Sequence, residues 1–289
     1  MLSLPKILVP VDFSDRSIGA VRYARNLACH FRSDLILVHV LPAIPHSVGG
    51  FEFGGVVVSD SLAERIPEAR RQLDEFLAHE LVGMKVCRMV LEGDPAAKIV
   101  EYAHSQQVSL IVMPTHGYGP FRRFLLGSVT AKVLHDADCP VLTSVHLEQA
   151  WGLEAAKPTR IVCGVDLGPQ SSKVLCWANR LAQEFHAELV LVHAAPLGES
   201  HFDETFDPEW RTTVEQRIRE RLIEIAAGLE AATVVIEAGA PADVVAAASG
   251  RLNAQMAVIG RSETNGMFGR LRTNAYAIIR QSPCPVVSV

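Results

Sequence analysis

Short runs of apolar, mostly β-branched residues alternate with longer mixed segments through the first half of the chain. Because these runs carry apolar residues at successive positions, they are typical of strands buried on both faces of a parallel sheet. The segments between them are long enough for helices. This alternation predicts an α/β fold with a doubly wound open sheet and right-handed crossovers. The expected strands cover residues 7–11, 35–40, 85–91, 108–113 and 141–145.

Helix start signals fall between these strands. Ser14 is a typical N-cap residue for a helix that runs to about residue 31. Asp94 followed by Pro95 combines an N-cap with proline at the first helical position, and predicts a helix to about residue 106. Ser59 or Asp60 is expected to cap a further helix that reaches about residue 81.

The same pattern occurs twice along the 289 residues. Residues 6–12 (KILVPVD) resemble residues 160–166 (RIVCGVD), and residues 34–40 (DLILVHV) resemble residues 188–194 (ELVLVHA), both at an offset of 154 positions. Later in each unit, a Gly-x-Pro motif and a Cys-Pro-Val motif recur at offsets of 146 and 145 positions. Such a repeat is far longer than a solenoid unit, so it predicts two domains in tandem. They are expected at residues 1–146 and 159–289, with a linker at residues 147–158.

Composition fits a packed globular protein, with 49% hydrophobic and 20% charged residues. The net charge of −5 is shared evenly, because residues 1–150 hold 14 basic and 16 acidic side chains and residues 151–289 hold 13 and 16. Neither half is a polycation. No nucleic-acid partner is therefore expected, since phosphate contacts need clustered Lys and Arg.

The sequence indicates a cytoplasmic protein that makes no membrane contact. Its N-terminus lacks the charged region and apolar core of an export signal. The longest uncharged stretch, residues 35–51, contains two prolines and a Gly-Gly pair, which excludes a membrane-spanning helix. The six cysteines show neither a C-x-x-C pair nor metal-ligand spacing with histidine, so no metal site is expected.

Candidate chemistry falls directly after two of the expected strands. Asp12 follows the first strand, and Pro114-Thr-His-Gly117 follows the fourth. Ligands of open α/β sheets collect at these carboxyl ends, where the strand order reverses. Further on, Gly127-Ser128 opens a helix, whose N–H groups and dipole suit a phosphate. The alternative for Gly127-Ser128 is a simple helix cap.

These motifs together resemble the universal stress protein family, over nearly the whole chain and as a tandem pair. The resemblance rests on Pro10-x-Asp12, Val38-His-Val40, Gly93-x-Pro95 and Met113-x-x-His116-Gly117. Nine residues separate Gly117 from the Gly127-Ser128 pair, which completes the motif. The family motif is G-x2-G-x9-G-(S/T), and Pro114 replaces its first glycine here. Pro114 lacks the N–H donor of that position, which is expected to weaken the site without closing it.

The resemblance implies that the first domain binds ATP or a related adenine nucleotide, with Mg²⁺ as an accompanying ion. It assigns adenosine to Asp12 and the main chain of Val40, and the ribose and phosphates to the loop and helix start. Arg122 and Arg123 would reach phosphate oxygens, or simply lie in solvent. An acidic side chain at position 127 is expected to fill the phosphate space and abolish binding. The candidate binding residues are Pro10, Asp12, Val40, Met113, Pro114, His116, Gly117, Gly127, Ser128, Val129 and Thr130.

The second domain departs further from the motif. Its corresponding candidates are Asp166, Gly260 and Thr273, but Glu263 stands where the first domain has Gly117, and a glycine is missing at the helix start. A carboxylate near phosphates is repulsive, although Arg261, Arg270 and Arg272 would offset part of that charge. We therefore expect unequal halves, with weak or no binding in the second.

The resemblance also implies the strand order 3-2-1-4-5 in each domain and docking of the two domains through their last strands as an internal pseudo-dimer; further homo-oligomerisation stays open.

The expected role is a nucleotide-binding protein of stress response or signalling. The alternatives are a slow ATPase or self-phosphorylating enzyme at the same site, and an assembly scaffold that binds nothing. The chain has no G-x-x-x-x-G-K-(S/T) motif and no nucleophile or orienting acid for His116, so no catalytic residue is assigned. His39 and His193 are interpreted as structural histidines.

Overall fold

The computed structural model describes residues 2–42, 62–117, 126–145, 157–195, 208–226, 233–261 and 270–289. Its first half contains strands β1 (Lys6–Pro10), β2 (Asp34–Leu41), β3 (Val86–Glu92), β4 (Leu110–Pro114) and β5 (Val141–Ser144), and helices α1 (Asp15–Phe31), α2 (Leu62–Glu75), α3 (Pro95–Ser105) and α4 (Ser128–Asp136). The second half contains strands β6 (Arg160–Gly164), β7 (Glu188–Ala195), β8 (Thr233–Ala238), β9 (Met256–Ile259) and β10 (Val286–Ser288), and helices α5 (Ser171–Phe185), α6 (Pro208–Ile225), α7 (Pro241–Arg251) and α8 (Arg270–Gln281). The predicted alternation of strands and helices is confirmed.

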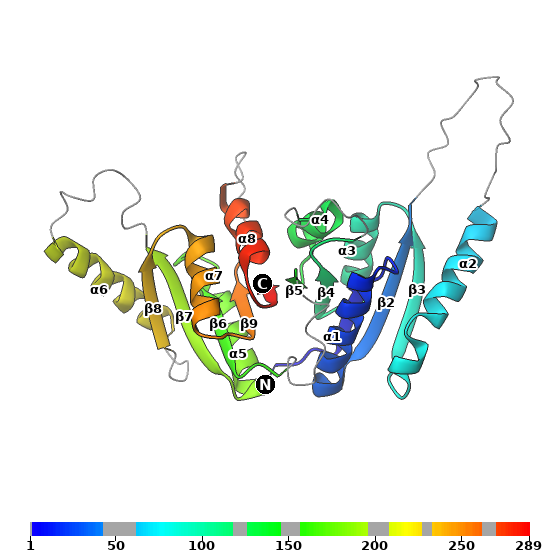
Figure 1. Ribbon diagram of the computed structural model, residues 1–289, viewed down its shortest axis with the longest axis horizontal. Helices are drawn as coiled ribbons and strands as arrows, with labels where there is room; N and C mark the ends of the chain where they lie inside the picture. Colours follow the sequence, from blue (N-terminus) through cyan, green and yellow to red (C-terminus); the bar gives the residue numbers. More distant parts are fainter. Residues whose placement is uncertain are drawn as a thin grey trace, which may run out of the picture.

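The described strands form one continuous sheet in the order β3-β2-β1-β4-β5-β10-β9-β6-β7-β8. Each half is parallel and has the predicted order 3-2-1-4-5, counted from its outer edge. The halves meet at β5 and β10, which pair antiparallel with Val287 opposite Leu142 (Figure 1). This pairing covers the apolar edge that each half would expose alone. The predicted pseudo-dimer is therefore confirmed.

Helices cover both faces of the sheet, and the two buried clusters follow these faces. One cluster joins α1, α2, α5 and α6 to the sheet through side chains such as Leu27 and Leu181. The other joins α3, α4, α7 and α8 through side chains such as Ile99 and Ile279. Because the strands are covered on both sides, their apolar runs are continuous and not alternating.

Two helix starts match the sequence prediction closely. Ser14 caps α1 by accepting from the Ser17 N–H, and Asp94 caps α3 by accepting from the Ala97 N–H at 2.8 Å. Each such cap contributes about 1 kcal/mol to stability. These bonds are local, which is why the sequence reveals them.

The helix expected to reach residue 81 is shorter than predicted. Helix α2 ends at Glu75, Leu77 adopts a left-handed conformation with φ of 52°, and a separate 3₁₀ turn covers Ala78–Leu81. The chain makes this break because Leu81 returns to the core beside α1, as its 4% exposure shows. The capping residues proposed for this helix lie outside the described residues.

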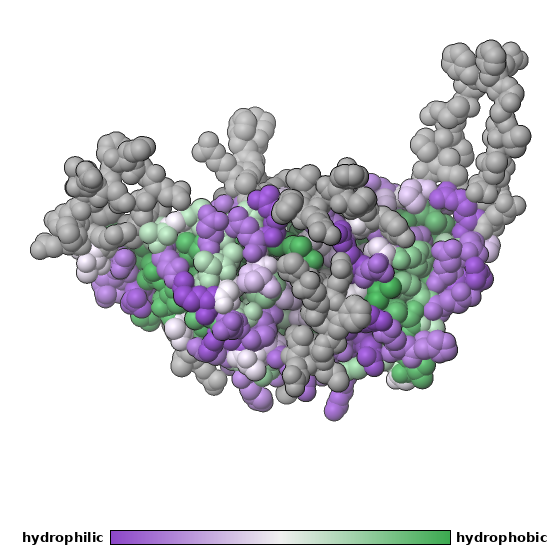
Figure 2. All heavy atoms as spheres, in the orientation of Figure 1, coloured by the Kyte–Doolittle hydropathy of each residue, from purple (hydrophilic) through white to green (hydrophobic). Residues whose placement is uncertain are grey.

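The outer surface of α2 is strongly hydrophilic (Figure 2). Arg71 pairs there with Glu68 at 2.8 Å and with Glu75 at 3.1 Å. No helix among the described residues is long and apolar enough to cross a membrane.

Candidate functional site

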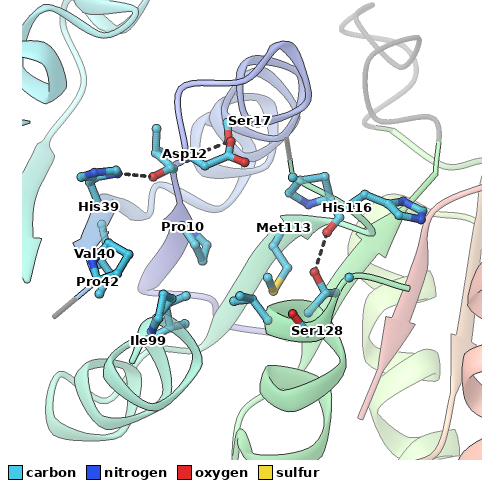
Figure 3. Close-up of a pocket in the computed structure, with 18 residues that line it drawn as sticks. Pro10, Asp12, Ser17, His39, Val40, Pro42, Ile99, Met113, His116 and Ser128 are labelled. Atoms are coloured by element: carbon cyan, nitrogen blue, oxygen red, sulfur yellow. Dashed lines mark hydrogen bonds between the residues drawn. The ribbon is translucent and has the colours of Figure 1, made fainter. Parts of the chain in front are cut away.

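A cavity of about 430 Å³ lies at the carboxyl ends of β1, β2 and β4 (Figure 3). The chain leaves β1 toward β2 on one side and later returns to β4 on the other, so the cavity lies at the reversal of strand order. All eleven first-domain candidates lie on its wall. The remaining wall residues are Val11, Ser17, Val38, His39, Pro42, Pro95 and Ile99.

Asp12 stands at one side of the cavity in a network of hydroxyl donors. Its Oδ1 accepts from Ser14 Oγ and from Ser17 Oγ, each at 2.5 Å, and from the Ser14 N–H at 3.1 Å. Its own N–H donates to Ser17 Oγ at 3.1 Å. These bonds fix the carboxylate at the start of α1, where the helix dipole favours a negative charge.

The other carboxylate oxygen of Asp12 faces Gly117. A Cβ atom at position 117 would stand 2.4 Å from Asp12 Oδ2, so the carboxylate or the loop would have to shift. Glycine at position 117 lets the loop pack this closely against the carboxylate. Arg16 Nη1 donates to the Gly117 carbonyl at 3.2 Å and holds the loop from the side of α1.

The amino end of α4 forms the opposite wall. Gly127 is its N-cap and has no side chain to bond the first helical N–H groups, unlike Ser14 on α1 and Asp94 on α3. The Gly127 N–H itself donates to the Thr115 carbonyl at 2.8 Å. The first-turn N–H groups of an α-helix have no intrahelical partner, so those of residues 128–130 are the donors that α4 brings to the cavity.

Thr130 and Gly127 bond the end of β4 and the residue after it, which fixes the start of α4. Thr130 Oγ1 donates to the Pro114 carbonyl at 3.0 Å, which ties α4 to the end of β4. A Cβ atom at Gly127 would stand 3.2 Å from the Thr115 carbonyl oxygen. The side-chain direction at position 127 is therefore toward the β4 loop. Gly127 also lines the cavity, so the expected loss of binding with an acidic side chain there stays a prediction.

The main chain of Val40 also faces the cavity side of β2. The Val38 carbonyl accepts from the Val11 N–H at 2.8 Å, and the Leu41 carbonyl accepts from the Gly93 N–H at 3.0 Å. Successive residues of a parallel strand direct their peptide groups to opposite neighbours. The peptide groups of Val40 therefore point to the β1 side, beyond the residue where β1 ends.

Apolar side chains line the part of the cavity between β2 and α3. They offer an apolar surface, in contrast to Asp12 and the α4 amino end. Sequence reasoning missed Ile99 and Pro42 here, although Ile99 follows Pro95 by one helical turn and that spacing was a usable signal. The apolar residues are Pro10, Val38, Val40, Pro42, Pro95, Ile99 and Met113.

His39 and His193 make the same bond in the two halves. His39 Nδ1 donates to the Val11 carbonyl, and His193 Nδ1 donates to the Val165 carbonyl, both at 2.7 Å. Since a carbonyl only accepts, each Nδ1 carries the proton. Both imidazoles thus tie the end of one strand to the chain that follows its neighbour.

His116 is buried, with 6% of its surface exposed. Its Nδ1 is 2.8 Å from Thr115 Oγ1, and its Nε2 has no hydrogen-bond partner in the described part of the chain. Burial lowers the pKa of His116, and the positive charge of Arg16 lowers it further. The imidazole is therefore neutral at pH 7.

The second half keeps the carboxylate and changes its surroundings. Asp166 Oδ1 accepts from Ser171 Oγ and from the Gly168 N–H, both at 2.8 Å. Gly260 packs against Val174, 3.1 Å from where a Cβ atom would stand. Helix α8 begins at Arg270, so Thr273 lies inside the helix and not at its start. Glu263 and the arginines at positions 122 and 123 lie outside the described residues.

Arg261 is not available to offset charge in the second half. Its guanidinium bonds main-chain carbonyls of the first half, 122 to 127 residues away in the sequence. The expectation that it would assist a second phosphate site is therefore wrong.

Comparisons with known proteins agree with the two-unit organisation. A model of the universal stress protein family matches residues 4–144 and again residues 158–289. A universal stress protein of Methanocaldococcus jannaschii is 37% identical over 137 residues, which cover 47% of this chain and 79% of that protein. One of Thermus aquaticus is 32% identical over 137 residues, covering 47% and 95%. The solved structure of a universal stress protein from Archaeoglobus fulgidus has the same fold, with a TM-score of 0.71 at 23% identity over 99% of this chain and 98% of that one.

Proposed function

Because this chain belongs to the universal stress protein family and carries two of its domains, we propose that it binds an adenine nucleotide, ATP foremost, in the cavity of its first half. The observation that carries the proposal is the pairing of a glycine-capped helix start with a fixed carboxylate across one cavity. The helix start attracts an anion, and the carboxylate accepts from hydroxyl groups. A nucleotide carries both groups.

Each part of the nucleotide has a matching wall. The Asp12 carboxylate would accept from ribose hydroxyls, and the peptide groups of Val40 would pair with the adenine edge. Adenine would lie on the apolar surface that includes Ile99 and Met113. The phosphates would accept from the N–H groups at the start of α4, and Mg²⁺ would be held chiefly by phosphate oxygens.

We infer a signalling or stress-response role in which nucleotide occupancy is the signal. All six cysteines lie among the described residues and are free thiols, which suits the reducing cytoplasm. Rapid turnover is not part of the proposal. Slow ATP hydrolysis at the same site is the alternative, because His116 is neutral and near the loop.

Native mass spectrometry of the purified full chain tests the proposal by looking for a bound adenine nucleotide. Calorimetric titration with ATP and with adenosine should give saturable binding that Gly117→Ala abolishes. A scaffold would bind neither ligand. Release of inorganic phosphate from ATP at rates that follow occupancy would favour the enzyme.

A further inference from the structure

Helix α4 is held at its carboxyl end by an arginine from the other half of the molecule. Arg261 Nη1 donates to the carbonyls of Ala137 at 2.8 Å and Leu134 at 3.3 Å, and its Nη2 donates to the carbonyl of Cys139 at 2.8 Å. The last carbonyls of a helix have no intrahelical partner, and its dipole places negative charge there. One guanidinium therefore satisfies three acceptors at the end of α4 and the turn after it.

The arginine is itself anchored. The Arg261 N–H donates to the Val289 carbonyl at 3.0 Å, and the Val289 N–H donates to the Ile259 carbonyl at 3.0 Å, so the residue extends the edge of β9 and β10. Burial lowers the pKa of the guanidinium, which nevertheless stays charged at pH 7. Its position is thus fixed by the sheet that joins the halves.

A second contact from the same half reaches the middle of α4. Tyr276 of α8 donates its hydroxyl to the Ala131 carbonyl at 3.0 Å. The two helices face each other across the middle of the molecule (Figure 1). Within its own half, α4 is tied at its start by the bond from Thr130 Oγ1 to the Pro114 carbonyl. The first half also holds the middle of α4, through the pair of Lys132 with Asp94 at 3.0 Å, whereas the bonds described here from the second half reach its middle and its end.

The Arg261 contact has no counterpart from the equivalent position of the first half. The residue of the first half that aligns with Arg261 at the offset of 146 positions is Thr115. Thr115 bonds the ring of its neighbour His116 at 2.8 Å instead of reaching the opposite half. A threonine is also too short to cap a distant helix. The second half thus supports a helix of the first without an equivalent contact from Thr115 in return.

We propose that the second half acts as a positioning element for the first, with Arg261 holding α4 so that its amino end presents the phosphate-binding N–H groups at the cavity. This rests on the proposed function, because the phosphates are the part of the ligand that α4 meets. It gives the half with the weaker nucleotide motif a role in binding. It also couples occupancy of the cavity to the docking of the two halves.

Full-chain Arg261→Ala, titrated with ATP and separately with adenosine at fixed salt and Mg²⁺, tests the proposal. We expect ATP affinity about tenfold weaker, within the usual range of coupling between sites, and adenosine affinity unchanged. Arg160→Ala is the matched control, because Arg160 bonds the Leu252 carbonyl at the end of α7 within the second half. Its two affinities should equal those of the wild type. Equal loss of both ligands in Arg261→Ala, or loss of neither, would overturn the proposal.

Two further measurements keep the outcome decisive. If Arg261→Ala does not fold, Arg261→Lys keeps the charge but cannot bond three carbonyls in a fixed fork, and should weaken ATP in the same selective way. If the wild type binds neither ligand, the proposed function fails. Amide hydrogen exchange of residues 132–136 in the ligand-free protein then decides: faster exchange in Arg261→Ala than in Arg160→Ala supports the positioning role, and equal exchange rejects it.

Discussion

Phe31 and Phe185 occupy equivalent positions in the two halves, 154 residues apart, and their rings meet edge to face with centroids 5.6 Å apart. A residue that contacts its own equivalent lies close to the pseudo-two-fold axis of the pair. His30 adds to this contact by stacking on Phe185 at 4.4 Å, with its Nε2 3.9 Å from Glu184 Oε1. The halves are therefore joined through the ends of α1 and α5 as well as through the sheet.

Phe185→Ala should weaken the docking of the halves. Loss of the ring removes two aromatic contacts across the interface, and we expect unfolding free energy to fall by about 1–2 kcal/mol. Phe76→Ala is the control, because Phe76 contacts Phe13 within the first half at 5.5 Å. Both variants should unfold at lower urea concentration than the wild type. Only Phe185→Ala should increase the radius of gyration measured by solution scattering. An unchanged scattering profile would show that the sheet alone fixes the docking.

Gly117→Ala should abolish nucleotide binding without unfolding the protein. The added methyl would stand 2.4 Å from Asp12 Oδ2, so the carboxylate or the loop must move. Gly250→Ala is a suitable control, because the nearest atom to its Cβ would be Pro283 Cγ at 3.9 Å and alanine favours the helix by about 1 kcal/mol. Calorimetric titration should show binding in the control only. Wild-type affinity for ATP in Gly117→Ala would show that the loop at position 117 is not part of the binding site.

Much of this fold is predictable because its signals are local or repeated. Ser14 and Asp94 cap the helices that follow them directly, and the repeat predicts two similar domains. The pairing of their last strands is implied by the family resemblance. Part of the cavity wall is predictable from local signals too, because Asp12 comes just after the first strand and Gly127 comes directly before a helix.

What the sequence does not reveal depends on side-chain direction and distant contact. Arg261 follows a strand as a site residue would, yet its partners lie at the end of α4 and in the turn after it, more than 120 residues away. The nearest neighbour of a side chain at position 127 would be the Thr115 carbonyl, which only the packed loop brings within 3.2 Å. Neither relationship leaves a periodic or local trace in the sequence.

His116 should make the protein less stable as pH falls. Burial, and then the charge of Arg16, hold its pKa in the folded chain below the ordinary value of about 6.5. The unfolded chain therefore binds the proton first, and folded-state stability present above that value is lost as pH decreases through it. His116→Gln should lose less stability than the wild type between pH 7.5 and 5, measured by urea unfolding. An equal or larger loss would mean that His116 does not contribute to the pH dependence.

The two halves should bind nucleotide unequally, with one tight site per chain. Asp12 and Asp166 are matched carboxylates, each accepting from a serine five residues later, at 2.5 Å from Ser17 and at 2.8 Å from Ser171. Their surroundings differ. Asp12 faces a glycine-capped helix start across the cavity. In the second half, Arg261 bonds carbonyls at the end of α4 and is not available to a phosphate near Asp166.

Titration with ATP should therefore saturate near one equivalent. Asp12→Asn should remove most of the binding heat, because the amide replaces one acceptor oxygen by an NH2 donor that cannot accept from a ribose hydroxyl. Asp166→Asn should leave the heat nearly unchanged. Each variant is a control for structural damage by the other, because both disturb the equivalent hydrogen bond from a serine, Ser17 in one half and Ser171 in the other. Two equivalent sites per chain would contradict the expected inequality, and loss of binding only in Asp166→Asn would place the working cavity in the second half.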